Sequence, residues 1–208
     1  MLSTLIDLIL HLDVHLLALT QQYGIWVYAL LFLIIFCETG LVVMPFLPGD
    51  SLLFVAGALC GLGALRLEWL APLLVLAAFC GDNTNYWIGR LLGNRLLKLT
   101  LIKEKHIAQT HAFYEKHGGK TILFARFVPI VRTFAPFVAG IGLMRYRLFL
   151  LFSALGSLTW IGSLSIAGYF FGNIPAIKNN LSLLIIGIVI VSFLPAIREF
   201  IRHRRQVT

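Results

Sequence analysis

The chain has 208 residues, of which 59% are hydrophobic and only 12% are charged. A soluble globular domain carries about 25% charged residues, so this composition excludes an ordinary soluble domain. It predicts an all-α integral membrane protein with a single domain over residues 1–208. The net charge of +8 is typical of membrane proteins that keep Lys and Arg on the cytoplasmic side. The basic residues form no stripe interleaved with aromatic ones, so we expect no nucleic-acid partner.

The cysteines and histidines do not form a recognisable ligand set. Cys37, Cys60 and Cys80 are an odd number without paired spacing, which argues against a disulfide framework or a zinc site. The histidines of residues 94–120 are five and six positions apart and do not share a helix face. We therefore expect no metal and no cofactor. The first Lys or Arg is Arg66, so we also expect no signal peptide.

The N-terminal segment, residues 1–24, is predicted to be a helix lying in the membrane interface. Its polar residues recur three and four positions apart, which indicates one polar stripe along a helix. Two acids and two histidines make this segment unsuitable for spanning a bilayer.

Residues 25–63 are predicted to form a re-entrant hairpin. Its two apolar arms, residues 25–37 and 51–63, have 13 residues each. A helix of that length spans about 20 Å, whereas the hydrocarbon core is about 30 Å thick. Prolines and glycines separate the arms, and at membrane depth such irregular backbone occurs only inside protein or beside a wet cavity. Glu38 and Asp50 flank this break.

The segment after the first hairpin, residues 69–93, is long enough to span the bilayer and has Asp82 near its middle. Residues 94–120 are polar and rich in lysine. We predict that they form an amphipathic segment on the cytoplasmic side.

The second half of the chain repeats this order of elements. Residues 121–144 are apolar and broken by prolines, which predicts a second re-entrant hairpin. Residues 148–172 are predicted to be a full span, and residues 181–197 a last, shorter one. The distribution of Lys and Arg places the C-terminus in the cytoplasm. The first hairpin then enters from outside and the second from inside.

Two short matches suggest that the halves are related. Val55-Ala-Gly57 recurs as Val138-Ala-Gly140, and Gly89-Arg-Leu-Leu-Gly93 recurs as Gly168-Tyr-Phe-Phe-Gly172. With opposite entry sides, residues 25–93 and 121–172 are predicted to form an inverted repeat, and such repeats place the substrate site at their interface. The alternative is two unrelated hairpins that share common Ala-Gly packing pairs. The glycines of residues 148–172 are also compatible with a homodimer.

The candidate site residues are the charges at membrane depth. A charged side chain there costs roughly 2.5–3.5 kcal/mol on insertion scales, so its presence indicates function. Glu38 and Asp50 belong to the first hairpin, and Arg126 and Arg132 belong to the second. Opposite charges on two hairpins predict one shared buried site. Asp82 is either a third proton-carrying site or a structural residue bonded within its own turn of helix.

These motifs resemble the DedA family, the bacterial branch of proteins with the SNARE-associated Golgi or VTT domain, including its members from enteric bacteria. The resemblance covers nearly the whole chain. It rests on Phe36-Cys-Glu-Thr-Gly, Pro48-Gly-Asp-Ser-Leu-Leu-Phe-Val-Ala-Gly, Gly81-Asp-Asn-Thr-Asn-Tyr and Phe124-Ala-Arg-Phe-Val-Pro-Ile-Val-Arg-Thr-Phe-Ala-Pro. The family implies a multi-pass protein of the bacterial inner membrane. It also implies dependence on proton motive force, a role in envelope integrity, and transport of undecaprenyl phosphate or a phospholipid.

The expected function is therefore that of a flippase for a lipid with an anionic, phosphate-bearing headgroup, and not that of an enzyme. Arginine fits phosphate with two parallel hydrogen bonds, so we assign lipid binding to Arg126 and Arg132. Glu38, Asp50 and Asp82 are assigned to proton coupling. The alternatives are a proton or cation antiporter, which leaves the arginines unexplained, and a lipid-phosphate phosphatase, which lacks an obvious nucleophile. A fixed structural salt bridge is the remaining alternative.

Overall fold

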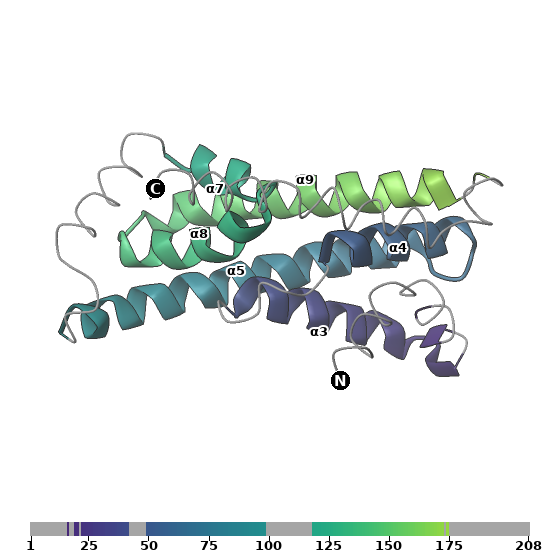
Figure 1. Cartoon of the computed structure of the whole chain (residues 1–208), viewed down its shortest axis with the longest axis horizontal. Helices are drawn as coiled ribbons and strands as arrows, with labels where there is room; N and C mark the ends of the chain where they lie inside the picture. Colours follow the sequence, from purple (N-terminus) through teal and green to yellow (C-terminus); the bar gives the residue numbers. More distant parts are fainter. Residues whose placement is uncertain are drawn as a thin grey trace, which may run out of the picture. The chain divides into compact units, whose positions relative to one another are not determined.

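The computed structural model describes residues 16, 19–20, 22–41, 49–98, 118–172 and 174. All regular elements in these residues are helices, which confirms the all-α class for this part of the chain. Most of residues 1–24 and 94–120, and all of residues 181–197, lie outside the described residues. The helices are α3 (Trp26–Gly40), α4 (Gly49–Gly61), α5 (Leu67–Lys98), α7 (Lys120–Ala125), α8 (Pro129–Ile141) and α9 (Tyr146–Gly172) (Figure 1).

Four of these helices are too short to cross a bilayer alone. α3 has 15 residues, α4 and α8 have 13 each, and α7 has 6, whereas a span needs about 20. They occupy the two segments that were predicted to be hairpins. α5, with 32 residues, begins two positions before the predicted span and continues five positions beyond it.

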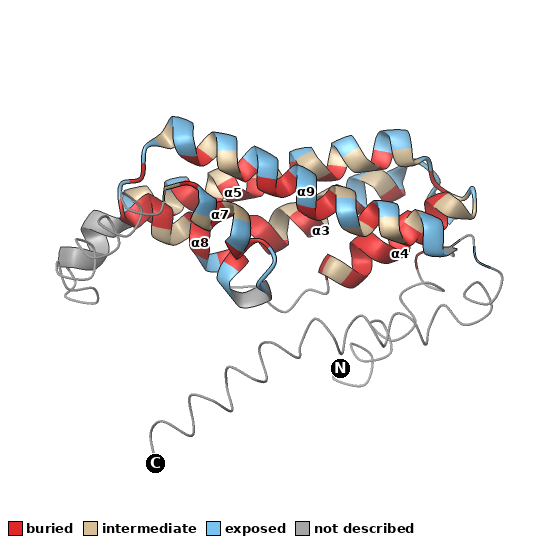
Figure 2. Cartoon of the chain, turned by 90° about the horizontal axis from the view of Figure 1, so that it is seen from above, coloured by how far each residue is buried: buried red, intermediate tan, exposed pale blue. Residues whose placement is uncertain are grey.

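Among the described residues, one helical stretch is both long and apolar enough to cross a membrane, Tyr146–Phe171 in α9. α5 has sufficient length, but from its middle onward it contains Asp82, Asn83, Asn85 and Arg90. Those side chains lower its apolarity and have to face protein or water. α5 therefore positions polar groups, while α9 presents alternating buried and exposed residues along its length (Figure 2).

The chain divides into two compact units, and the boundaries between them fall inside α3, α5 and α9. Unit 1 comprises residues 1–32, 48–74 and 161–208, and unit 2 comprises residues 33–47 and 75–160.

Unit 1 has α4 at its centre. α4 is buried along nearly its whole length, from Ser51 to Cys60 (Figure 2). It crosses α9 so closely that a Cβ at Gly57 would collide with the carbonyl oxygen of Ser165. A Cβ at Gly168 would likewise collide with the carbonyl oxygen of Phe54. Only glycine allows two helix backbones to approach in this way.

Unit 2 contains a second crossing of the same kind, between α8 and α5. A Cβ at Gly140 would collide with the carbonyl oxygen of Tyr86, and one at Gly89 with that of Phe137. In both units each glycine faces the carbonyl three residues before the other glycine. The hydrophobic core around this crossing contains Tyr86, Ile122, Ala125, Ala135, Ala139, Met144 and Phe149.

Two of the glycines that were predicted to form a packing face on α9 already pack against other residues of this chain. Gly156 lies against Arg126 and Leu123, and Gly168 lies against α4. A Cβ added at Gly162 would meet no heavy atom of the described residues within 4 Å. Of these three, only Gly162 keeps space for another helix.

Candidate functional site

The site in unit 2 is built around the break between α7 and α8. α7 ends at Ala125, the chain turns through Arg126, Phe127 and Val128, and α8 begins at Pro129. Proline suits the first helical position because its fixed φ is already helical and no N–H is needed there. Val128, the N-cap of α8, is extended and supplies no side-chain cap. The positive end of the α8 dipole therefore lies between Arg126 and Arg132 in the chain.

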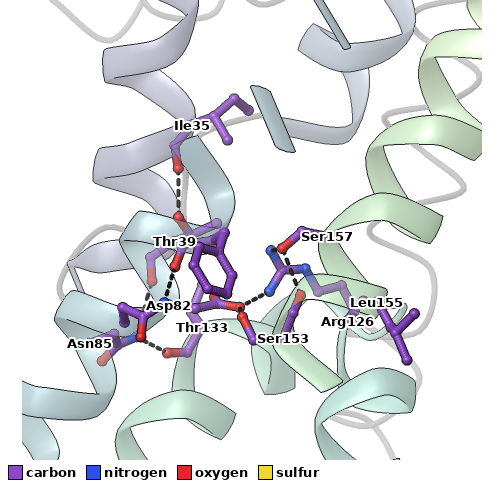
Figure 3. Close-up of polar contacts among 12 residues, drawn as sticks. Ile35, Thr39, Asp82, Asn85, Arg126, Thr133, Ser153, Leu155 and Ser157 are labelled. Carbon is purple, nitrogen blue, oxygen red and sulfur yellow. Dashed lines mark hydrogen bonds and ion pairs between the residues drawn. The ribbon is translucent and has the colours of Figure 1, made fainter. Parts of the chain in front are cut away.

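Arg126 forms a buried ion pair with Asp82 of α5, and their side chains are 3% and 1% exposed. The guanidinium also donates to the Ser157 hydroxyl at 2.7 Å, and Ser153 donates to the same carboxylate oxygen of Asp82 at 2.6 Å. Figure 3 shows Arg126 extended between α5 and the two serines of α9. Hydrogen bonds from two elements thus hold this carboxylate and guanidinium in place.

Arg132, in the first turns of α8, forms a second buried ion pair. Its Nη2 lies 2.6 Å from Oε1 of Glu38, and the two side chains are 7% and 1% exposed. Glu38 lies near the C-terminal end of α3. The pair therefore joins the C-terminal end of α3 to the N-terminal part of α8.

Trp160 of α9 lies beneath both arginines. The guanidinium carbons of Arg126 and Arg132 are 5.4 Å and 4.6 Å from the centre of its ring. Both distances are within the range of a cation–π interaction. The two carbons are therefore at most about 10 Å apart, the sum of 5.4 Å and 4.6 Å. A single aromatic ring thus links the two ion pairs.

Asn85 fixes the backbone around the site. Its side-chain amide donates to the carbonyl of Thr39 at 3.1 Å and to that of Thr133 at 2.7 Å (Figure 3). One buried side chain of α5 thereby ties the end of α3 to the start of α8. α3 and α5 also approach closely, because a Cβ at Gly81 would collide with the Thr39 hydroxyl. Glu38 and Asp82 are consequently presented by two tightly packed helices.

Four of the five predicted site residues come together here. Glu38, Asp82, Arg126 and Arg132 form the two ion pairs. Asp50 is half-buried in the first turn of α4 and belongs to unit 1. The carboxylate that pairs with Arg126 is thus Asp82 of α5, which lies outside the two predicted hairpins.

The alternative that Asp82 bonds within its own turn of helix is wrong, since its partners are Arg126 and Ser153. Sequence reasoning missed three contributors from α9. Ser153, Ser157 and Trp160 are four and three positions apart and so share one helix face. A tryptophan in the middle of a span, away from the interface that this residue prefers, was the available signal.

The site pairs two carboxylates with two guanidinium groups. In the described residues no group of three or more His, Cys, Asp or Glu could hold a metal ion. The carboxylates of Glu38 and Asp82 face guanidinium groups instead. Guanidinium groups beside a helix N-terminus bind phosphate and carboxylate groups well.

Comparison with known proteins places the chain in a family. The VTT-domain family profile matches residues 47–170, more than half of the chain. Protein DedA of Escherichia coli K12 is 58% identical over 206 residues, 97% of this chain and 94% of that protein. The chain belongs to the DedA family of VTT-domain proteins. This confirms the resemblance that the charged motifs indicated, including the likeness to the DedA protein of enteric bacteria.

Other DedA relatives support a membrane location. A membrane protein of Mycobacterium leprae is 45% identical and covers 79% of this chain and 75% of its own length. Inner membrane protein YqjA of E. coli K12 is 36% identical over 71% of this chain and 69% of that protein. The chain is accordingly a membrane protein of this family. No solved structure matches it.

Proposed function

We propose that this member of the DedA family is a transporter of the bacterial inner membrane that moves a phosphate-bearing lipid and is coupled to protons. Undecaprenyl phosphate and phospholipids are the lipids proposed, and the cellular role would be envelope integrity. The observation that carries the proposal is the pair of buried arginines, each facing a buried carboxylate and both stacked on Trp160.

The proposed mechanism is an exchange of partners. A phosphate headgroup takes Arg126 and Arg132, which fit its oxygens with charge-assisted hydrogen bonds. The N-terminus of α8 adds positive potential. Asp82 and Glu38 then lose their arginines and accept protons, because a lone buried carboxylate favours its neutral form. The lipid tail remains in the bilayer while the headgroup crosses.

The proposed membrane arrangement is an inverted repeat of a re-entrant hairpin and a span. α3 with α4, and α7 with α8, would be the hairpins, and their lengths suit half-crossings. The matched glycine crossings of the two units support a repeat. Residues 181–197 would add a last span and leave the C-terminus in the cytoplasm. Asp50, in the first hairpin, is proposed as a further proton-carrying group, and a homodimer is compatible with this arrangement.

Reconstitution in liposomes tests the proposal. Arg132→Ala and Arg126→Lys should slow movement of a fluorescent or chemically trapped lipid phosphate at least tenfold, because a bidentate contact is lost in each case. Arg147→Ala, at an exposed position, is the matched control and should leave the rate unchanged. Wild-type rates in both site variants, with correct folding, would contradict the proposal.

Hydrolysis of the lipid phosphate is the second candidate. It is favoured by one contact, the hydrogen bond from the Ser153 hydroxyl to Asp82, since a serine nucleophile needs an adjacent base. Transport is preferred because that same carboxylate is occupied by Arg126. Release of inorganic phosphate from the lipid would favour the enzyme. Proton flux without any lipid dependence would favour an antiporter.

A further inference from the structure

We infer that the site takes up as many protons as the bound headgroup has negative charges, so that the occupied site is electrically neutral. This inference rests on the proposed function, because it requires phosphate to bind at Arg126 and Arg132. It concerns the number of protons per lipid and thereby distinguishes phosphomonoester from phosphodiester lipids.

The four charges of the two ion pairs balance one another when the site holds no lipid. Glu38 and Asp82 carry two negative charges, Arg126 and Arg132 carry two positive ones, and every one of these side chains is at least nine-tenths buried. The groups that α9 places against these four charges are uncharged. They are Ser153, Ser157 and Trp160.

The remaining ionisable groups described in unit 2 lie in other surroundings. Arg90 donates to the Tyr86 hydroxyl, which donates to the Met144 carbonyl. Tyr146 donates to Asn83. Arg145 and Arg147 are exposed at the start of α9, Lys120 is exposed at the start of α7, and Cys37 and Cys80 are half-buried thiols. These groups are bonded elsewhere, exposed or neutral, and Asp50 belongs to unit 1. Among the described residues of unit 2, the four buried charges therefore set the balance.

A bound anion upsets this balance unless protons accompany it. A monoanion leaves one excess negative charge in the buried site, and a dianion leaves two. Each uncompensated charge at membrane depth costs several kcal/mol. Protonation of a carboxylate that has lost its arginine removes that cost. A monoanion therefore brings one proton and a dianion brings two.

Trp160 makes both carboxylates available to one headgroup. It holds the two guanidinium carbons within about 10 Å of each other, from the distances of 5.4 Å and 4.6 Å to its ring. We infer that a phosphate that draws in one arginine also draws in the second, by a small movement of its long side chain. Glu38 and Asp82 are then both released, and the site can accept either one or two protons.

Isothermal titration of the purified protein at pH 8, in buffers of different ionisation enthalpy, counts the protons bound with each ligand. Farnesyl phosphate is the monoester probe, dianionic because its second pKa is about 6. Dihexanoyl phosphatidylglycerol is the monoanionic diester probe. We expect about two protons with the first and about one with the second, matching the charge to be neutralised. Equal counts, or no proton uptake, would overturn the inference while leaving lipid binding intact. Failure of both probes to bind would instead contradict the proposed function.

Removing one acid should shift both counts together. Glu38→Gln deletes one buried negative charge, so the counts should fall to about one and about zero. Glu68→Gln, at an exposed position in the first turn of α5, is the control and should leave them unchanged. Unchanged counts in Glu38→Gln would overturn the inference. If that variant does not fold, the comparison of the two probes in the wild-type protein still decides.

Discussion

Arg126 and Arg132 are both paired with a carboxylate, but the surroundings of the two pairs differ. Arg126 donates to the hydroxyl of Ser157, and Asp82 accepts from that of Ser153, both on α9. Arg132 and Glu38 connect two helix ends. Either arrangement is also compatible with a structural role, because breaking one partner of a buried pair costs about 3–5 kcal/mol. Loss of activity in a single variant therefore does not separate structure from transport.

A double substitution at the Asp82–Arg126 pair separates the two roles. Asp82→Asn alone leaves Arg126 buried without its counter-charge and should lower the free energy of unfolding by about 3–5 kcal/mol. Combining it with Arg126→Gln removes both charges and should recover most of that loss. Thermal unfolding in detergent measures stability, and the liposome assay measures transport. We expect the double variant to fold and to be inactive, whereas an active one would make the pair purely structural.

The charged residues of the site could be predicted from the sequence, but one of the two ion pairs could not. Glu38, Arg126 and Arg132 were identifiable because charges in apolar segments are costly. The pairing of Arg126 with Asp82 depends on how α5, α8 and α9 cross, and local sequence does not encode that geometry.

At the scale of elements, the ends of the short helices were predictable and their packing was only partly so. Pro129 and Gly40 interrupt helices for local backbone reasons, and α3 and α8 end or begin there. The extension of α5 to Lys98 was missed because the prediction ended the span where apolar residues end. Helix formers such as Leu, Arg and Lys continue a helix past that point.

The glycine crossings lead to a prediction about elements. Gly57→Ala and Gly140→Ala each place a methyl group against a backbone carbonyl of the neighbouring helix. The helices then have to separate, which should cost about 1–3 kcal/mol. Gly162→Ala is the control, because it has open space on α9 and alanine favours a helix by about 0.5–1 kcal/mol. In thermal unfolding, Gly57→Ala and Gly140→Ala should therefore be less stable than the wild-type protein, whereas Gly162→Ala should be at least as stable. Equal stability of all three variants would contradict the close crossing.

At the scale of the whole molecule, α5 and α9 occupy matching places in the two halves of the chain. Each follows a pair of short helices, and each contributes the glycine that meets the Ala-Gly pair of a short helix. In an inverted repeat, the two long helices start on opposite sides of the membrane. A repeat related by an axis along the membrane normal would start them on the same side. The direction of each long helix therefore decides which symmetry the chain has.

Cysteine labelling from each side of the membrane tests this symmetry. Glu68 and Arg147 are both exposed in the first turn of their helices, α5 and α9. In a background with Cys37, Cys60 and Cys80 replaced by alanine, Glu68→Cys should react with a membrane-impermeant maleimide in spheroplasts. Arg147→Cys should react only in inside-out vesicles, because Lys and Arg concentrate in cytoplasmic loops. Labelling of both positions from the same side would exclude the inverted arrangement, and with it the proposal that the hairpins enter from opposite faces.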